Sequence, residues 1–200
     1  NNVGYDQNPK FSPDGRYVAW LSMERDGYEA DRQRLCCLDL TTGEKKYLTE
    51  SFDSNVDDFC WSDNQKDAMI YYIGIWHGTE NLYAVNWKGE VKQLTDTWHD
   101  FGSLQMMNNK KQILAERHCY TAPADLYDIT PNTKKPEKTV LTQITEENKE
   151  ILDQLGKPTV QQRWVKTTDG KEMLTWIILP PNFDETKKYT TLLFCEGGPQ

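Results

Sequence analysis

The chain has 200 residues, enough for one domain and part of a second, and its 23 basic and 31 acidic residues give a net charge of −8. This charge balance excludes the broad basic field needed to bind a nucleic acid backbone, and no apolar run approaches the roughly 20 residues of a membrane span. Aromatic residues make up 12% of the chain, so the sequence can form a packed core and is not expected to be disordered.

The first three-quarters of the chain contains a repeat of about 44 to 50 residues. Residues 34–49 align with residues 81–95, and a looser third copy comprises residues 125–129 followed by Val140-Leu141-Thr142. The matched positions in the first two copies are Leu35 with Leu82, Gly43 with Gly89, Leu48 with Leu94, and Thr49 with Thr95.

Each copy is predicted to form a β-hairpin, because alternating apolar residues flank a turn that contains Gly or Asn. A turn rich in Ser, Asn or Asp leads into a further strand before each hairpin, at residues 11–20, 61–72 and 107–115. With the short strand that precedes this turn, each unit has about four strands, which is typical of a β-propeller blade. The Lys- and Pro-rich tip of the third hairpin, residues 133–138, is interpreted as a solvated loop.

Three such units account for residues 1–143. Closed propellers need about four to eight blades, and each blade needs a neighbour on both sides to bury its two faces. We therefore expect this chain to be a segment of a longer protein, with the missing blades upstream of Asn1.

The pattern changes after residue 143. Apolar residues at helical spacing over 144–156 predict a short connecting helix or turn, with Thr145 as a candidate N-cap and Gly156 as a candidate stop. Pro158 then favours extended chain. Residues 144–158 are accordingly interpreted as a linker.

The last part of the chain is predicted to begin another domain. Residues 160–167 and 172–179 form a predicted hairpin around an Asp169-Gly170 turn. The continuous apolar run at residues 190–195 predicts a strand buried on both faces. This run leads directly into Glu196-Gly197-Gly198-Pro199. Glycines at such a position allow the backbone to bend sharply and to approach a ligand closely.

An ordered series of motifs near the end resembles the prolyl oligopeptidase family of serine peptidases, in particular its bacterial dipeptidyl peptidase and acylaminoacyl-peptidase branch. The resemblance implies an all-β chain, with the last three blades of a β-propeller at residues 1–143, the linker at 144–158, and the first strands of an α/β-hydrolase domain at 159–200. The motifs are Leu179-Pro180-Pro181, Phe183-Asp184, Lys188-Tyr189, Leu192-Leu193-Phe194 and Gly197-Gly198-Pro199, with weaker support from Phe11–Arg16 and Ala122–Tyr127.

This resemblance implies a parent serine exopeptidase, similar to dipeptidyl aminopeptidases, that hydrolyses short peptides with a Ser-His-Asp triad and without a cofactor. The triad would follow the Gly-Gly-Pro loop, and Gly-x-Ser-x-Gly occurs nowhere in this sequence. This chain alone is therefore expected to be inactive. The residues carried over are Gly197 and Gly198, as the backbone oxyanion-hole loop. Glu196 stands where the family usually has His and is interpreted as pointing away from the oxyanion, with binding of the substrate amine as an alternative.

The other polar candidates have structural interpretations. His77, His99 and His118 lack metal-ligand spacing, and the five cysteines contain no Cys-x-x-Cys pair, so no metal site and no disulfide framework is predicted. Asp57-Asp58 is interpreted as a turn at the start of a blade. Glu116-Arg117-His118 could face the central cavity, although half of the polar residues on any strand face solvent.

Two other hypotheses remain open at this stage. One is a non-catalytic, TolB-like propeller that binds proteins, and the other is a set of incomplete blades that self-associates through exposed strand edges. The apolar run at 190–195 favours the enzyme. The expected partners are short peptide substrates, with no nucleic acid and no membrane span, and a homodimer through the full-length protein is a further hypothesis. Family resemblance alone suggests a periplasmic location.

Overall fold

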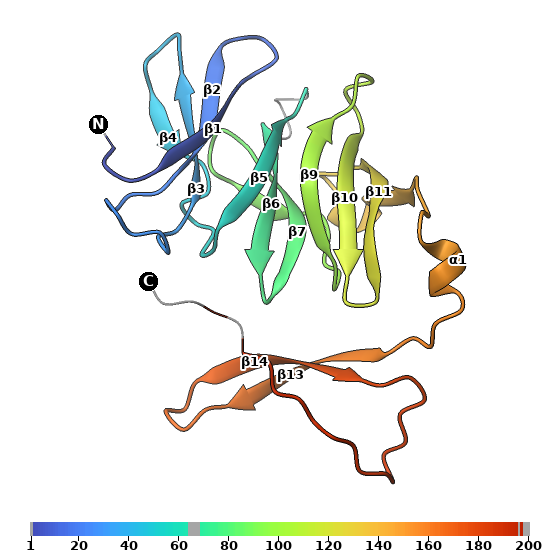
Figure 1. Cartoon of the computed structure of the whole chain (residues 1–200). Helices are drawn as coiled ribbons and strands as arrows, with labels where there is room; N and C mark the ends of the chain where they lie inside the picture. The colour runs from blue at the N-terminus through green and yellow to red at the C-terminus, as the bar shows by residue number, and fades with distance from the viewer. Residues whose placement is uncertain (1, 64–68, 196, 198–200) are drawn as a thin grey trace.

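The computed structural model describes residues 2–63, 69–195 and 197, and its regular structure is almost all β-strand (Figure 1). Unit 1 is an antiparallel sheet in the order β1-β2-β3-β4. Its strands are β1 (Asp6–Phe11), β2 (Tyr17–Ser22), β3 (Arg34–Asp39) and β4 (Lys45–Tyr47).

Units 2 and 3 repeat this arrangement, with four strands that pair antiparallel in sequence order. A single parallel pair, Glu80 with Asp100, joins the two units. Unit 2 comprises β5 (Val56–Trp61), β6 (Ile70–Trp76), β7 (Thr79–Val85) and β8 (Val91–Gln93). Unit 3 comprises β9 (Asp100–Met106), β10 (Ile113–Cys119), β11 (Ala122–Thr130) and β12 (Val140–Gln143), with a 3₁₀ turn at Pro136–Lys138.

Unit 2 is buried on both faces, because alternate residues of its strands enter two different cores. Ile70 and Tyr72 of β6 pack in the core shared with unit 1. Tyr71 and Ile73 of the same strand pack in the core shared with unit 3. This two-sided burial explains the unbroken apolar run in β6, which a strand with one solvated face would not need.

The Leu-Thr repeat has a structural basis in a buried hydroxyl group. The Thr49 Oγ1 accepts a hydrogen bond from the Leu35 N–H, and the Thr95 Oγ1 accepts one from the Leu82 N–H, each at 2.9 Å. The Thr95 hydroxyl in turn donates to the Asn81 Oδ1 at 2.8 Å. Each hydroxyl thus satisfies a strand N–H that the short outer strand does not reach.

The third copy of this contact uses Thr145, so the sequence alignment to Thr142 was wrong by three residues. Thr145 Oγ1 accepts from the Leu126 N–H at 2.9 Å and donates to Asp125 Oδ1 at 2.7 Å. The longer tip of the third hairpin changes the number of residues between the Leu and the Thr that make this contact. The expected N-cap role of Thr145 is also wrong, because its hydroxyl is already used. Helix α1 (Lys149–Leu152) is only four residues long and has no side-chain cap hydrogen bond at Asn148.

A bulge occurs at the same place in β1, β5 and β9, the first strand of each unit. Two residues oppose a single residue of the neighbouring strand, at Asn8-Pro9, Asp57-Asp58 and Ser103-Leu104. The prediction of a turn at Asp57-Asp58 was therefore wrong, because both residues lie within β5. Short polar residues are typical of bulges and of turns, because both interrupt the hydrogen-bond ladder of a sheet. The sequence pattern alone therefore does not distinguish a bulge from a turn.

The Asp58 carboxylate joins the first strands of all three units. One oxygen accepts a hydrogen bond from the Lys10 Nζ of β1 at 2.9 Å, and the other accepts from the Leu104 N–H of β9 at 2.9 Å. The side chains of Asp58 and Lys10 are 22% and 33% exposed, so the contact is shielded from much of the solvent. Asp58 and Leu104 both lie in bulges, which free them from regular pairing, so one carboxylate of β5 contacts the first strands of both neighbouring units.

Beyond α1, the predicted hairpin is confirmed as β13 (Thr159–Lys166) paired with β14 (Glu172–Leu179). Figure 1 shows it lying across one end of the three units. The predicted buried strand at 190–195 is wrong for this structure: these residues form no strand, and Leu192, Leu193 and Phe194 are 85–90% exposed. Among the described residues the hairpin sheet has two strands only, so no ladder pairs with this segment.

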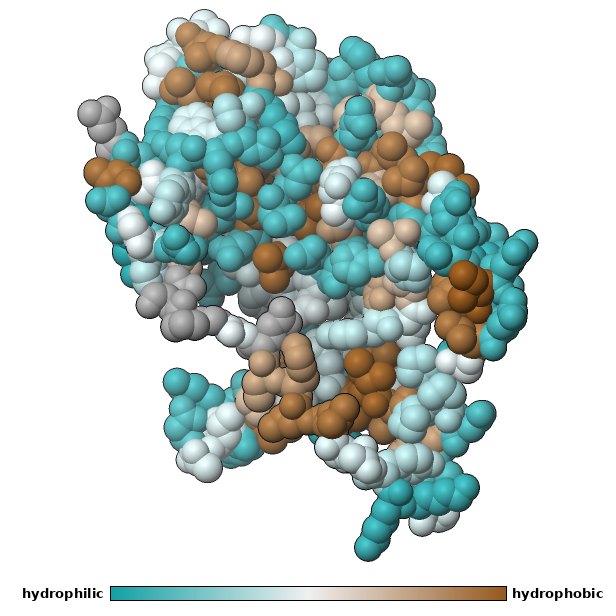
Figure 2. Space-filling view, viewed as in Figure 1, coloured by the Kyte–Doolittle hydropathy of each residue, from teal (hydrophilic) through white to brown (hydrophobic). Residues whose placement is uncertain are grey.

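Figure 2 shows apolar side chains gathered on the hairpin and the segment that follows it. The exposed large hydrophobic residues of this region are Trp164, Val165, Met173, Ile178, Phe183, Tyr189, Leu192, Leu193 and Phe194. In the described ranges, no helix is both long and apolar enough to cross a membrane.

The buried hydroxyl of Thr95 gives a test of the repeated contact. Thr95→Val keeps the shape of the side chain but leaves the Leu82 N–H without its acceptor, so we expect a loss of about 1–3 kcal/mol in the free energy of unfolding. Urea denaturation measures it. Thr97→Val is the matched control, because the Thr97 hydroxyl reaches Asn81 only at 3.4 Å. Equal losses in the two variants would contradict the assigned role of Thr95.

Candidate functional site

The predicted oxyanion loop lies at the end of the described chain. Gly197 has a φ of +150°, a conformation that favours glycine, and a side chain added there would meet no atom within 4 Å. Gly198 and Glu196, the other two predicted site residues, lie outside the described residues. Gly197 is thus an open backbone position that follows an exposed apolar segment.

Aromatic contacts hold the hairpin against the units. The Trp176 ring of β14 lies 5.3 Å from the Trp98 ring, with the planes at 84°, and 5.6 Å from the Tyr120 ring. On β13, the Trp164 ring lies 5.1 Å from the His77 imidazole in an edge-on arrangement. Each such pair of rings contributes about 0.5–1.5 kcal/mol to stability, in addition to the contribution from the surface area that it buries. The hairpin is therefore positioned by rings from three loops of units 2 and 3.

Gly78 lies close to the Trp176 ring in this interface. Its φ is +69°, and a Cβ atom at this position would lie 2.8 Å from the Trp176 Nε1. The turn between β6 and β7 therefore needs glycine for both its backbone conformation and its clearance from the indole ring.

A group of carboxylates lies at the end of units 2 and 3 that faces the hairpin, where β7 and β9 begin (Figure 1). The Glu80 N–H donates to the Asp100 Oδ1 at 2.9 Å, and the His118 Nε2 lies 3.6 Å from the Asp100 Oδ2. Burial, followed by the charges of Asp57 and Asp100, raises the pKa of Glu80. Burial and the charge of Asp58 raise the pKa of Asp57. The carboxylates of Asp57, Glu80 and Asp100 are therefore gathered at this end of the units.

The Glu116-Arg117-His118 segment lies on β10, the second strand of unit 3. The segment is therefore on a middle strand of the unit and not on its first strand. Of its three residues, His118 contacts the carboxylate of Asp100 at the start of β9. Arg117 lines a hollow beside the linker, and His118 lines part of the same hollow. His118 thus contributes both to the carboxylate group and to the hollow.

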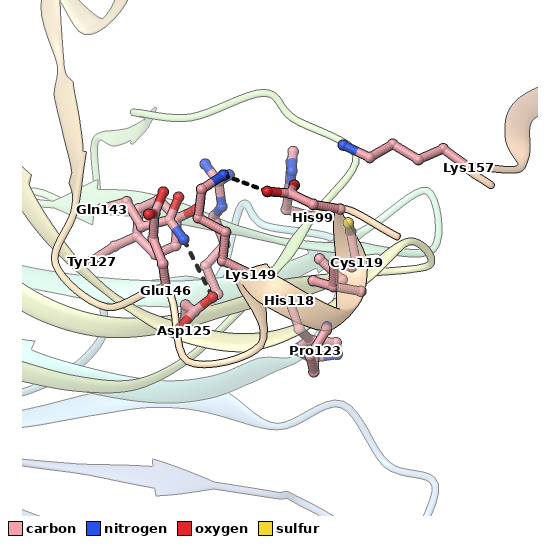
Figure 3. Close-up of a pocket in the computed structure, with 14 residues that line it drawn as sticks. His99, His118, Cys119, Pro123, Asp125, Tyr127, Gln143, Glu146, Lys149 and Lys157 are labelled. Atoms are coloured by element: carbon pink, nitrogen blue, oxygen red, sulfur yellow. Dashed lines mark hydrogen bonds and ion pairs between the residues drawn. The ribbon is translucent and has the colours of Figure 1, made fainter. Parts of the chain in front are cut away.

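The hollow measures about 170 Å³ and lies between unit 3 and residues 143–157 (Figure 3). Its walls carry charges of both signs. The polar and charged residues that line it are His99, Arg117, His118, Asp125, Tyr127, Gln143, Glu146, Lys149, Asp153 and Lys157.

The aromatic interface and the hollow were not predicted from the sequence. Both are formed by residues far apart in the chain, and no spacing rule connects Trp98 with Trp176. One available signal was the presence of Trp98 at a loop position, where polar residues are the norm. Within the described ranges, no group of three or more His, Cys, Asp or Glu side chains converges as a metal ion would require.

Comparisons with known proteins place these features in context. Dipeptidyl-peptidase 5 from Porphyromonas gingivalis is 44% identical over 199 residues, which cover 99% of this chain and 28% of the relative. An acylaminoacyl peptidase solved with Z-Gly-Gly-Phe-chloromethyl ketone superposes with a TM-score of 0.67 and 21% identity, over 88% of this chain and 25% of that one.

The β-propeller domain of the trilobed protease from Pyrococcus furiosus superposes with a TM-score of 0.54 and 18% identity, over 76% of this chain and 41% of that domain. No family model matches. The chain thus spans about 28% of the length of the curated relative. The resemblance to peptidases of the prolyl oligopeptidase type, predicted from the sequence, is confirmed, as is the all-β class of the chain.

Gly78 offers a test of the aromatic interface. Gly78→Ala places a methyl group against Trp176, so we expect Trp fluorescence to shift to the red and proteolysis between residues 144 and 158 to accelerate. Gly170→Ala is the matched control, because its φ is +83° but nothing lies within 4 Å. Both variants are expected to lose roughly 1–2 kcal/mol of folding stability, because alanine is strained in this backbone conformation. Equal fluorescence and proteolysis in both would count against the contact.

The carboxylate group predicts a pH-dependent stability. The pKa of Glu80 is higher in the folded state than its ordinary value of 4.5, so ionisation of Glu80 reduces folding stability as pH rises through that interval. Glu80→Gln cannot ionise, and we expect the variant to be more stable than the unmodified protein at pH 7, with the difference disappearing below about pH 4.

Thermal unfolding measured between pH 3.5 and pH 8 tests this expectation. Glu172→Gln, at an exposed position of β14, is the control for loss of a carboxylate elsewhere. A Glu80→Gln variant that is less stable at pH 7 would show that the Glu80 charge is favourable in the fold.

Proposed function

We propose that this chain is the part of a serine exopeptidase in which a propeller joins an α/β-hydrolase domain. In this proposal, units 1 to 3 are the last three blades, over residues 1–143. Residues 144–158 are the linker and residues 159–200 begin the hydrolase domain. The observation that carries the proposal is the 44% identity to a dipeptidyl-peptidase 5 over 99% of the chain, which includes the blades, the linker and the hairpin together.

The arrangement of the units supports the assignment to blades. Each unit has four antiparallel strands in sequence order, and unit 2 is buried on both faces between its neighbours. The bulged first strands are joined through Asp58, as expected of strands that surround a common axis.

The chemistry assigned to this chain is oxyanion stabilisation. The nucleophile, the base and the residue that orients it would lie in sequence beyond the Gly-Gly-Pro loop. The N–H groups of Gly197 and Gly198 would donate hydrogen bonds to the carbonyl oxygen as negative charge develops on it. A main-chain donor has no side chain to reorient, so the loop is ready before the substrate binds. In this proposal the Glu196 carboxylate would not contact the oxyanion, because a second negative charge there would oppose this step.

The proposed substrates are short peptides, and the proposed reaction is removal of dipeptides from them. The carboxylates gathered at the hairpin end of units 2 and 3 would give that end a negative field. Such a field would favour peptides that approach with a free N-terminal ammonium group. The hairpin, held over the same end by Trp164 and Trp176, would narrow the path that a large substrate could take.

The test uses the full-length protein that contains this chain. We expect a fluorophosphonate to label a single Ser, and labelling to disappear in the Ser→Ala variant of that residue. We also expect the unmodified protein to release dipeptides from short peptides faster than it cleaves internal bonds. A folded full-length protein that takes up no label would contradict the proposal and favour a propeller that binds proteins.

Gly198 provides the test of the oxyanion role. Gly198→Pro removes the N–H, and we expect kcat to fall by about 10²–10³-fold with little change in KM. Gly198→Ala keeps the N–H and is the matched control. Equal losses of kcat in the two variants would contradict a donor role for this backbone group.

A further inference from the structure

The hollow beside the linker contains an arginine that lacks a carboxylate partner. The Arg117 guanidinium lies 4.0 Å from the centre of the Tyr127 ring, stacked on its face. Stacking fixes the plane of the guanidinium and leaves the N–H groups at its edge free to donate. The side chain is half-buried. Across the described part of the chain, Arg117 makes no ion pair and no side-chain hydrogen bond.

Asp125 is the natural partner of Arg117 but is engaged elsewhere. The two residues are directly opposite in the register of β10 and β11. The Asp125 carboxylate accepts hydrogen bonds from the Thr145 hydroxyl at 2.7 Å and from the Gln143 amide at 3.2 Å. These contacts direct it toward the linker, because Thr145 belongs to the repeated hydroxyl contact. The fold thereby leaves the Arg117 charge uncompensated.

Two further donors face the same hollow. The His99 Nδ1 is buried and, within the described residues, has no hydrogen-bond partner. Burial and then the charge of Arg117 lower the pKa of His99. On the linker side, Lys149 pairs with Asp153 at 3.1 Å, whereas Lys157 makes no ion pair in the described ranges. Figure 3 shows Lys149 and the separate Lys157 side chain.

We propose that this hollow binds the carboxylate of an amino acid or short peptide, with Arg117 as the principal donor and Lys157 as a second cation from the linker. Arginine binds carboxylates through two parallel hydrogen bonds, which a stacked guanidinium presents in a fixed plane. At about 170 Å³, the hollow has room for several water molecules of about 30 Å³ each, so a small ligand fits.

The acidic residues in the same walls favour a zwitterion over a phosphate. Glu146 and Asp125 line the hollow beside the cations. A phosphate dianion would be repelled by them, whereas the ammonium group of an amino acid or peptide would be attracted. A ligand held by Arg117 on unit 3 and Lys157 on the linker would fasten the linker to this unit. The inference stands on the hollow itself, although dipeptides released by the proposed reaction belong to this class.

The test measures binding of glycylglycine to the full-length protein by isothermal titration calorimetry, after treatment with a fluorophosphonate to block any reactive Ser. We expect Arg117→Met to lower the affinity by about 10- to 100-fold, since a charge-assisted contact is lost. Lys157→Met should lower it by a smaller factor. Lys138→Met, an exposed lysine of the 3₁₀ turn in unit 3, should have no effect.

A second measurement needs no variant and so does not depend on the folding of Arg117→Met. Glycylglycinamide lacks the carboxylate, and we expect it to bind the unmodified protein at least about tenfold more weakly than glycylglycine. Equal binding of the two probes, equal binding by Arg117→Met, or no glycylglycine binding would each overturn the inference. Fluorophosphonate labelling is read separately, so failure here is distinguishable from failure of the proposed peptidase function.

Discussion

The contact of one carboxylate with three strands determines how the repeated units are arranged. The Asp58 carboxylate accepts hydrogen bonds from Lys10 of the first strand of unit 1 and from the Leu104 N–H of the first strand of unit 3. Asp58 and Leu104 both lie in bulges, which free them from regular pairing in their own ladders. Loss of Asp58 would leave the Lys10 ammonium without its carboxylate partner and the Leu104 N–H without its acceptor, which is costlier than the loss of one surface ion pair.

The sequence predicted the elements that depend on local pattern. The strand-turn-strand repeat is confirmed because each hairpin encodes its own turn and alternation, as in residues 34–49. The third Leu-Thr position was misplaced because an irregular tip changes the spacing without changing the contact. The strand predicted at residues 190–195 failed for a different reason: apolar content indicates where a strand would be buried but does not supply the strands that bury it.

Little of the candidate site could be predicted in the same way. Gly197 was identified through an ordered series of motifs, but the aromatic interface brings Trp98 next to Trp176 across 78 positions of sequence. The hollow depends on the direction of a single carboxylate. Arg117 and Asp125 are opposite one another in the register of β10 and β11, which alone would predict an ion pair. Only the hydrogen bonds from Thr145 and Gln143 show that Asp125 is directed away.

The outermost strands have a consequence for the solubility of the protein. β4, β8 and β12 are only three or four residues long, and β4 and β8 carry Lys45, Lys46 and Lys92. A short, cationic edge is a poor template for another strand, because few backbone groups are available and each approach brings like charges together. The outer rim therefore resists the edge-to-edge strand pairing that leads to fibres.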